Sequence, residues 1–266
     1  MLKIIFQDDY LLVVNKSAGI VVDQSQTNKE PTLTDLLKKE FNIQLFRGGI
    51  VHRLDKDTSG VLLVAKTQKA LENLQNQFKE RKIKKEYLAL VHGYVMESGR
   101  VEAAIMRNPR NREKFIVLEG FTSKESKLTF EASTGGREAV TEYEPVKLLV
   151  MGPEFIEGIF ADFNKIQMRK LERQKYGEFT LLSCKPQTGR THQIRVHLKY
   201  INHPIVADGK YAGRKMVRLD RRWCPRMFLH AAKIGFEHPV SREWMEFESP
   251  LPKDLKEALD QLKVQS

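Results

Sequence analysis

The spacing of apolar and polar residues in the first third of the chain changes between two periods. Short apolar runs predict strands at Lys3–Phe6, Leu11–Asn15 and Val61–Ala65. In two other stretches the apolar residues return every three or four positions, which predicts amphipathic helices. The first spans Leu33 to Phe41 behind Thr32, and the second spans Gln68–Lys82 behind Thr67. Both threonines are residues that suit a helix N-cap.

More strands than helices are expected in the rest of the chain. The predicted strands are Tyr87–Val91, Thr141–Val150, Phe179–Cys184, Met227–Phe236 and Trp244–Glu248. Helices are expected at Thr191–Ile201, with Thr191 as the cap, and at Lys253–Val264. Because strands and helices do not alternate strictly, the order favours an α+β fold with a mixed or largely antiparallel sheet. A chain of 266 residues suits one large domain or two small ones.

The charge of the chain favours a polyanionic partner. Lys and Arg number 45 against 34 Asp and Glu, which gives a formal net charge of +11. The apolar runs are too short to span a bilayer, and Asp8 and Asp9 interrupt the N-terminal run before a signal sequence can form. We therefore expect a soluble, cytoplasmic protein without a membrane partner. Cys184 and Cys224 are the only cysteines and lack metal-ligand spacing, so neither a disulfide framework nor a zinc site is expected.

A basic segment at about residues 152–177 lies between two predicted strands and is expected to be an insertion. Its cations are Lys165, Arg169, Lys170, Arg173 and Lys175. Such a run is either the solvated face of a helix or a set of phosphate contacts, and the sequence leaves both readings open. The same holds for Arg107–Arg112 and Arg81–Lys85.

The segment Val51–Gly60 is the strongest candidate for a functional site. It joins a histidine, an arginine and Asp55 to hydroxyl residues and a glycine, directly before the buried strand at Val61–Ala65. Read locally, Asp55 and Thr58 only hydrogen-bond a turn and Gly60 supplies backbone freedom. The choice depends on the wider pattern of motifs.

That pattern, His-Arg-Leu-Asp-x-x-Thr-Ser-Gly, resembles the signature of the RNA pseudouridine synthases of the large ribosomal and transfer RNA-modifying class. In that family the aspartate is catalytic, which points to Asp55. Asn15–Ile20 is similar to the first family motif, with Ser17 where proline is usual. Lys85–Gly93 is similar to the second, whose tyrosine faces the target base, and this assigns Tyr87.

A third motif, Thr188–Leu198, places Arg195 where the family has the arginine that pairs with the catalytic aspartate. His192 and His197 in the same motif are expected to be structural. Asn202–Tyr211 and Leu229–Ala232 complete a resemblance that runs from Asn15 to about Pro250. It implies the pseudouridine synthase catalytic fold over residues 1–266, a mainly antiparallel sheet flanked by helices and loops with a central active cleft. Since the first motif begins at Asn15, no separate N-terminal RNA-binding domain is expected.

The implied reaction moves the bond to ribose from a ring nitrogen of uridine to ring carbon 5, after the base is flipped out of its stack. Asp55 would be the nucleophile, at the ribose or at ring carbon 6, or would promote elimination to a glycal. Tyr87 would stack on the base and act as a general base, while Arg195 keeps Asp55 ionised. Arg53, Leu54 and Ile205 would bind the substrate. The resemblance implies an RNA partner. A single carboxylate without a His/Cys/Asp cluster fits a reaction that needs no metal and no cofactor, and a monomer is expected.

Two other classes of function stay open. A non-catalytic RNA-binding module or RNA chaperone would use the same fold only to hold RNA. A base-excising hydrolase would use Asp55 to stabilise an oxocarbenium ion and would release uracil. The sequence does not choose between ribosomal RNA and transfer RNA as substrate.

Overall fold

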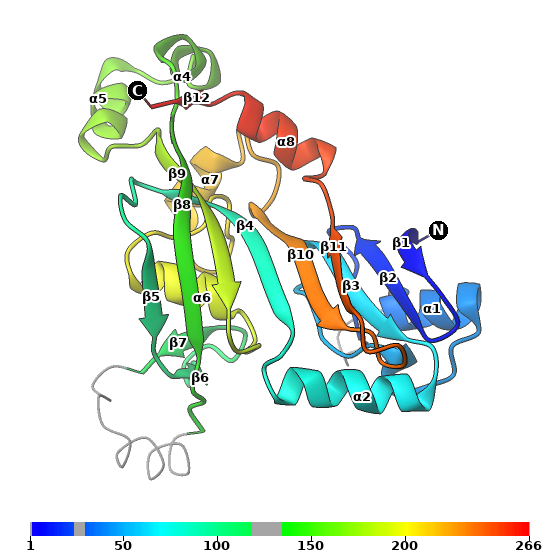
Figure 1. The fold of residues 1–266 in the computed structure, drawn as a ribbon. Helices are drawn as coiled ribbons and strands as arrows, with labels where there is room; N and C mark the ends of the chain where they lie inside the picture. The colour runs from blue at the N-terminus through cyan, green and yellow to red at the C-terminus, as the bar shows by residue number, and fades with distance from the viewer. Residues whose placement is uncertain (1, 24–29, 119–134, 266) are drawn as a thin grey trace. The chain divides into compact units, whose positions relative to one another are not determined.

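The computed structural model of the protein describes residues 2–23, 30–118 and 135–265. The chain folds into two compact units: the first comprises Met1–Tyr87 and Leu229–Leu251, and the second Leu88–Phe228 and Pro252–Ser266. Each unit combines strands with helices (Figure 1). The expectation of one catalytic domain over residues 1–266 stays a prediction. Among the described residues, no helix has the length and apolar character needed to cross a membrane.

The first unit is built on a sheet with one parallel pairing. In order, its neighbouring strands are β1 (Lys3–Gln7), β2 (Leu11–Lys16), β3 (Ser59–Ala65), β10 (Leu229–Glu237) and β11 (Trp244–Glu248). The β1–β2, β2–β3 and β10–β11 pairs are antiparallel, whereas β3 and β10 are parallel. Its helices are α1 (Leu33–Phe41), the 3₁₀ turn η1 (Phe46–Gly49) and α2 (Gln68–Lys79).

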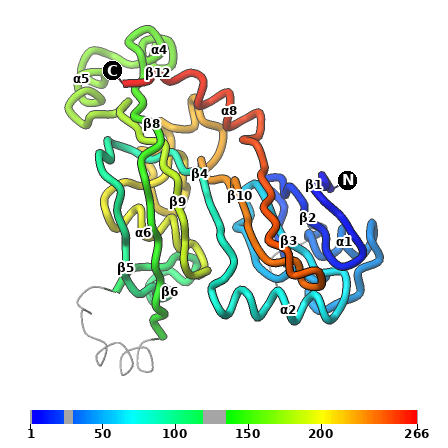
Figure 2. Tube along the Cα trace, viewed as in Figure 1, coloured from blue at the N-terminus to red at the C-terminus, as the bar shows by residue number. Residues whose placement is uncertain are grey.

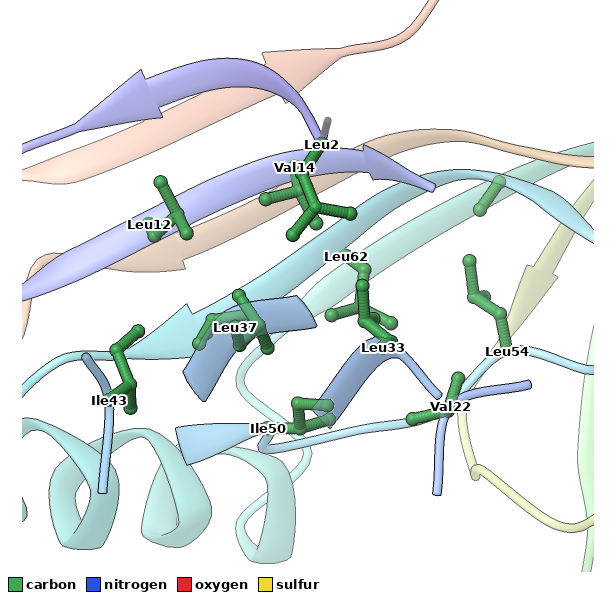
Figure 3. Close-up of a cluster of buried hydrophobic side chains, with 12 residues drawn as sticks. Leu2, Leu12, Val14, Val22, Leu33, Leu37, Ile43, Ile50, Leu54 and Leu62 are labelled. Carbon is green, nitrogen blue, oxygen red and sulfur yellow. The ribbon is translucent and has the colours of Figure 1, made fainter. Parts of the chain in front are cut away.

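Successive side chains of a strand point to opposite faces of a sheet, and in the central strands β2 and β3 both faces are buried. On one face Leu12, Val14 and Leu62 pack with Leu33 and Leu37 of α1 (Figure 3). The alternate residues of β2 and β3 pack with α2 in a second cluster. This two-sided burial explains why β3 is a continuous apolar run rather than an alternating one.

The second unit is built around a long antiparallel pair of strands, Val140–Val150 and Glu178–Pro186. Its strands, in order, are the second half of β4 (Lys84–His92), β9 (Glu178–Pro186), β8 (Val140–Val150) and β12 (Lys263–Val264). β5 (Gly99–Glu102) also pairs with β8, and β6 (Ile105–Arg107) pairs with β7 (Phe115–Val117). The helices α4 (Pro153–Ile159) and α5 (Lys165–Arg173) form the connection from β8 to β9 (Figure 2). Within the described part of this unit, the other helices are α6 (Gln193–Tyr200), α7 (Arg214–Asp220) and α8 (Lys253–Asp260).

The α+β class and the mainly antiparallel sheet are confirmed, and so are the caps at Thr32 and Thr67. Helix α2 ends at Lys79, three residues earlier than predicted. The predicted C-terminal helix ends at Asp260, because Lys263–Val264 pairs with β8 as a strand. The prediction that Thr191 caps α6 is wrong. Its N-cap is His192 in the left-handed conformation, and Thr191 does not cap it.

Candidate active site

Asp55 lies in a tight turn that is anchored on both sides. Its carbonyl oxygen accepts a hydrogen bond from the Thr58 amide at 3.1 Å, and its side chain is half-buried. Leu54 on one side is 3% exposed and belongs to the core shown in Figure 3. On the other side Ser59 begins β3. The carboxylate is therefore carried by a short backbone segment between two fixed points.

The first motif holds the far side of this turn. The Lys16 side chain is fully buried, and its Nζ donates to the carbonyl oxygens of Ser17 at 2.9 Å and Lys56 at 3.1 Å. The Gly19 amide donates to the same Lys56 oxygen at 2.8 Å. Lys56 directly follows Asp55, so two donors from the first motif fix the backbone next to the carboxylate. Hydrogen bonds to carbonyl oxygens offset part of the cost of desolvating a buried ammonium.

Ser59 and Gly60 tie the turn to β10. His230 Nε2 lies 2.9 Å from the Ser249 carbonyl oxygen and therefore donates to it, which leaves Nδ1 to accept from the Ser59 hydroxyl at 2.9 Å. Gly60 has a φ of +120°, and a Cβ there would lie 2.1 Å from the Ala231 carbonyl oxygen. A glycine is therefore required where β3 runs close beside β10.

His52 is a structural histidine. Its Nε2 accepts from the Leu63 amide at 3.0 Å, and its ring stacks on Phe78 at a centroid distance of 5.0 Å. Burial, with the positive charge of Lys85 as a second cause, lowers the pKa of His52 to about 3. The imidazole is therefore neutral at physiological pH and holds the start of the motif against β3.

Tyr87 lies within the electrostatic reach of Asp55. It is half-buried in β4 and packs against the same core cluster as Leu54. Burial raises the pKa of Tyr87 above its usual value of 10, and the charge of Asp55 raises it further. The phenol is therefore protonated at neutral pH. Two residues earlier on the same face of the strand, burial lowers the pKa of Lys85 to about 8.

Arg195 is held rigidly in the second unit. It is 6% exposed, and its guanidinium forms a bidentate pair with Asp208, from Nε to Oδ2 and from Nη2 to Oδ1, both at 2.8 Å. The guanidinium also lies 5.0 Å from the centroid of the Tyr211 ring. A bidentate pair fixes the plane of the guanidinium as well as its position. The sequence did not single out Asp208 as the partner, although it lies inside a matched motif.

The two histidines of the third motif are structural, as expected. His192 Nδ1 lies 2.9 Å from the Tyr211 hydroxyl. His197 bridges the Thr141 hydroxyl at 2.9 Å and the Ala103 carbonyl at 3.1 Å. Burial lowers the pKa of His197 to about 4, so it is neutral at physiological pH.

The other predicted site residues lie in different environments. Arg53 is exposed, while Ile205 is fully buried and forms an isolated bridge with Val91. Asp55, Leu54 and Tyr87 belong to the first unit, and Arg195 and Ile205 to the second. The five cations of the predicted insertion are also in the second unit and all are exposed, on α5 and directly after it: Lys165, Arg169, Lys170, Arg173 and Lys175.

Sequence reasoning missed a further basic element, α7 and the two residues after it. Its exposed cations are Arg214, Lys215, Arg218, Arg221 and Arg222. Lys215 Nζ donates to Gln174 Oε1 at 3.2 Å, and Arg222 Nη2 donates to Asp162 Oδ2 at 2.8 Å. These bonds join α7 to the connection that carries α5. The signal was present as five cations within residues 214–222.

Comparisons with known proteins agree with the motifs. A family model described as RNA pseudouridylate synthase matches residues 10–200. An uncharacterised RNA pseudouridine synthase of Bacillus subtilis is 34% identical over 268 residues, covering 98% of this chain and 73% of the relative. A ribosomal large subunit pseudouridine synthase D of Neisseria meningitidis serogroup B is 35% identical over 273 residues, covering 100% of this chain and 62% of the relative. A protein of the same name from Xanthomonas campestris is 34% identical over 275 residues, covering 100% and 70%.

Two solved human structures are similar to this chain. RNA pseudouridylate synthase domain containing 1 has a TM-score of 0.70 at 26% identity and covers 100% of this chain and 89% of its own. RNA pseudouridylate synthase domain containing 4 has a TM-score of 0.67 at 21% identity, covering 99% and 94%. The second likeness concerns the fold alone.

Proposed function

The chain belongs to the RNA pseudouridylate synthase family, and we propose that it converts particular uridines of structured RNA to pseudouridine with Asp55 as the nucleophile. The observation that carries the assignment of Asp55 is the anchored turn. Lys16 and Gly19 hold the residue that follows the carboxylate, and the charge of Asp55 raises the pKa of Tyr87. A nucleophile that needs no reorganisation at the moment of reaction lowers the barrier by positioning.

The proposed reaction is an isomerisation that conserves all atoms. The bond between ring nitrogen 1 and ribose carbon 1′ breaks, and a bond forms between carbon 1′ and ring carbon 5. Carbon 5 then loses its proton and nitrogen 1 gains one. In the ribose route the Asp55 carboxylate bonds to carbon 1′ as the bond to nitrogen 1 breaks, and this new bond breaks in turn when ring carbon 5 bonds to carbon 1′, so the carboxylate is regenerated. Because the reacting atoms of a stacked uridine are buried, the target base is flipped out, at a cost of on the order of a few kcal/mol.

Tyr87 is proposed to stack on the flipped uracil. Its raised pKa makes the phenolate rare at neutral pH, so the resting hydroxyl is a hydrogen-bond donor. A role as the base that takes the proton from carbon 5 then requires the phenol to pass on its own proton at the same time. Stacking and proton transfer are separated by the Tyr87→Phe variant, which keeps the ring and removes the hydroxyl.

Arg195 is assigned as the partner of the Asp55 carboxylate by its place in the third motif. In the structure Asp208 engages Nε and Nη2 of the same guanidinium. A nearby guanidinium would favour the ionised carboxylate and keep the nucleophile active. Arg53 is proposed to contact the RNA backbone or the vacated stack, and Leu54 and Ile205 to supply apolar walls for the base.

The RNA is proposed to contact the basic surface formed by α5 and α7. Two relatives are named for the large ribosomal subunit, which makes ribosomal RNA the first substrate to test and transfer RNA the second. We expect a cytoplasmic monomer that acts without metal or cofactor. The cations are exposed and supply charge without reading sequence, which suits contacts to phosphates.

The reaction is tested by incubating the protein with ribosomal RNA fragments and transfer RNA, then analysing the digested nucleosides. Pseudouridine without free uracil is expected, and Asp55→Asn should form none while binding RNA within about threefold of wild type. Free uracil would instead indicate the hydrolase. Binding by the wild-type protein without any change in nucleosides would indicate the non-catalytic RNA-binding module.

The RNA surface is tested by the salt dependence of binding. Neutralising Arg169 and Arg173 to Gln should flatten the plot of log affinity against log salt by roughly 0.7 per lost contact on single strands and roughly 0.9 on duplex. The matched control neutralises Lys253 and Lys256, two exposed cations on α8 of the same unit. Equal salt-dependence slopes for the α5 and α8 variants would mean that α5 is only a solvated helix face and does not contact the RNA.

A further inference from the structure

We propose that Asp220 is a positioning residue for the reaction, because it holds the backbone that presents Asp208 to Arg195. The chain of contacts runs from Asp220 to the amide of Ala207, the neighbour of Asp208, and then to the guanidinium. All four residues belong to the second unit. The inference rests on the proposed role of Arg195.

Asp220 is a buried carboxylate at the end of α7 that meets three donors. Its Oδ2 accepts from the Ala207 amide at 2.8 Å and is hydrogen-bonded to His92 Nε2 at 3.1 Å. Its Oδ1 accepts from the Tyr176 hydroxyl at 3.0 Å, and that hydroxyl accepts from Trp223 Nε1 at 3.0 Å. A buried carboxylate is kept only when such donors replace its water.

The Ala207 backbone is in a conformation that alanine avoids. Its φ is +58°, within the left-handed region where an L-residue with a Cβ is disfavoured about five- to thirtyfold. Glycine would adopt this conformation without that penalty. The hydrogen bond to Asp220 supplies a reason why the strained conformation persists, since strain of this kind is retained only where the surroundings impose it.

The strained residue directly precedes the carboxylate that grips Arg195. Asp208 Oδ1 also accepts from the Lys210 and Tyr211 amides, at 2.9 and 3.2 Å, so the carboxylate is part of the same turn. If Ala207 left the left-handed region, the turn and its carboxylate would rotate together. The plane of the guanidinium would then change, because the bidentate pair couples the two groups.

The two oxygens of Asp220 provide a matched control. Asp220→Ala removes the acceptor of the Ala207 amide. Tyr176→Phe removes a donor to the opposite oxygen and the acceptor of Trp223 Nε1, but it leaves the bond from the Ala207 amide to Asp220 in place. Both variants disturb the same buried network and are expected to lower Tm. Only Asp220→Ala should lower kcat, by up to roughly 10²-fold, with the KM for RNA within about threefold of wild type. Tyr176→Phe should keep kcat within about threefold.

A rescue variant separates positioning from general destabilisation. Placing Ala207→Gly in the Asp220→Ala background removes the cost of the left-handed backbone, so kcat should recover by about five- to thirtyfold relative to Asp220→Ala. Ala207→Gly alone is measured alongside, so that the recovery is expressed as a ratio. If Asp220→Ala does not fold, Asp220→Asn with and without Ala207→Gly replaces it, because the amide keeps one acceptor oxygen and a smaller defect is expected.

The kcat values of the Asp220 and Tyr176 variants are compared with that of Arg195→Ala in the same assay. Near-normal turnover of Arg195→Ala would overturn the role of Arg195 itself. Two results would overturn the positioning role of Asp220 while leaving the role of Arg195 in place, provided that Arg195→Ala is inactive. In the first, loss of kcat merely follows loss of Tm in the Asp220 and Tyr176 variants. In the second, Ala207→Gly gives no recovery. Loss of kcat restricted to the Asp220 variants, with recovery by Ala207→Gly, supports it.

Discussion

Replacing Thr58 with valine is expected to stabilise the protein. Thr58 is 2% exposed, and among the described residues its Oγ1 has no hydrogen-bond partner. A buried hydroxyl without a partner costs about 1–3 kcal/mol, and valine keeps the β-branched shape of threonine. We therefore expect Thr58→Val to raise the free energy of unfolding by about 1–2 kcal/mol, which corresponds to a rise in Tm of roughly 2–8 °C.

The assay is thermal and denaturant unfolding of Thr58→Val beside Thr180→Val. Thr180 is also fully buried, but its hydroxyl accepts from the Val95 amide at 2.9 Å and donates to the Gly93 carbonyl at 2.8 Å. Thr180→Val leaves both backbone groups without a partner and should lower stability by about 2–3 kcal/mol. A fall in Tm for Thr58→Val as large as that for Thr180→Val would refute the reasoning, because it would show that the Thr58 hydroxyl is satisfied.

Three further predictions concern the residues around Asp55. The pKa of His52 is lowered to about 3 from 6.5, so as pH falls this histidine takes up a proton in the unfolded chain before it does so in the folded protein. The free energy of unfolding should therefore decline below pH 6.5 by up to about 1.4 kcal/mol per pH unit. His52→Gln should flatten this dependence in denaturant titrations at about pH 5 to 7. Tyr87→Phe should bind RNA normally, and single-turnover rates reduced by more than about 10²-fold would support proton transfer, whereas a mild loss would limit Tyr87 to stacking. Lys16→Met should lower kcat more than RNA affinity, since it removes one of the two donors that hold the Lys56 carbonyl beside the nucleophile. Equal loss of both, or unchanged kcat, would contradict this role.

Local patterns predicted the elements whose determinants are local. The strand at Leu11–Asn15 and the capped helix after Thr32 were expected from periodicity and a capping residue, and both are present. The C-terminal strand at Lys263–Val264 was missed because its pairing partner, β8, is more than a hundred residues away in the sequence. Short strands of this kind are set by tertiary pairing rather than by propensity.

The residues of the candidate site likewise divide into those that the sequence identifies and those that only the fold reveals. The motif resemblance selected Asp55, Tyr87 and Arg195, whose catalytic roles stay predictions. Two contacts could not be predicted from spacing alone: the Asp208 pair with Arg195 and the buried Asp220 network. A buried aspartate and a solvated one look alike in a sequence, and only the fold shows which donors surround each carboxylate.

The central claim is tested most directly by mapping pseudouridines in ribosomal and transfer RNA from cells with and without this protein. The account predicts that one or more pseudouridines disappear when the protein is absent, return with the wild-type chain, and do not return with Asp55→Asn expressed at the same level. An unchanged map, or full restoration by Asp55→Asn, would contradict it.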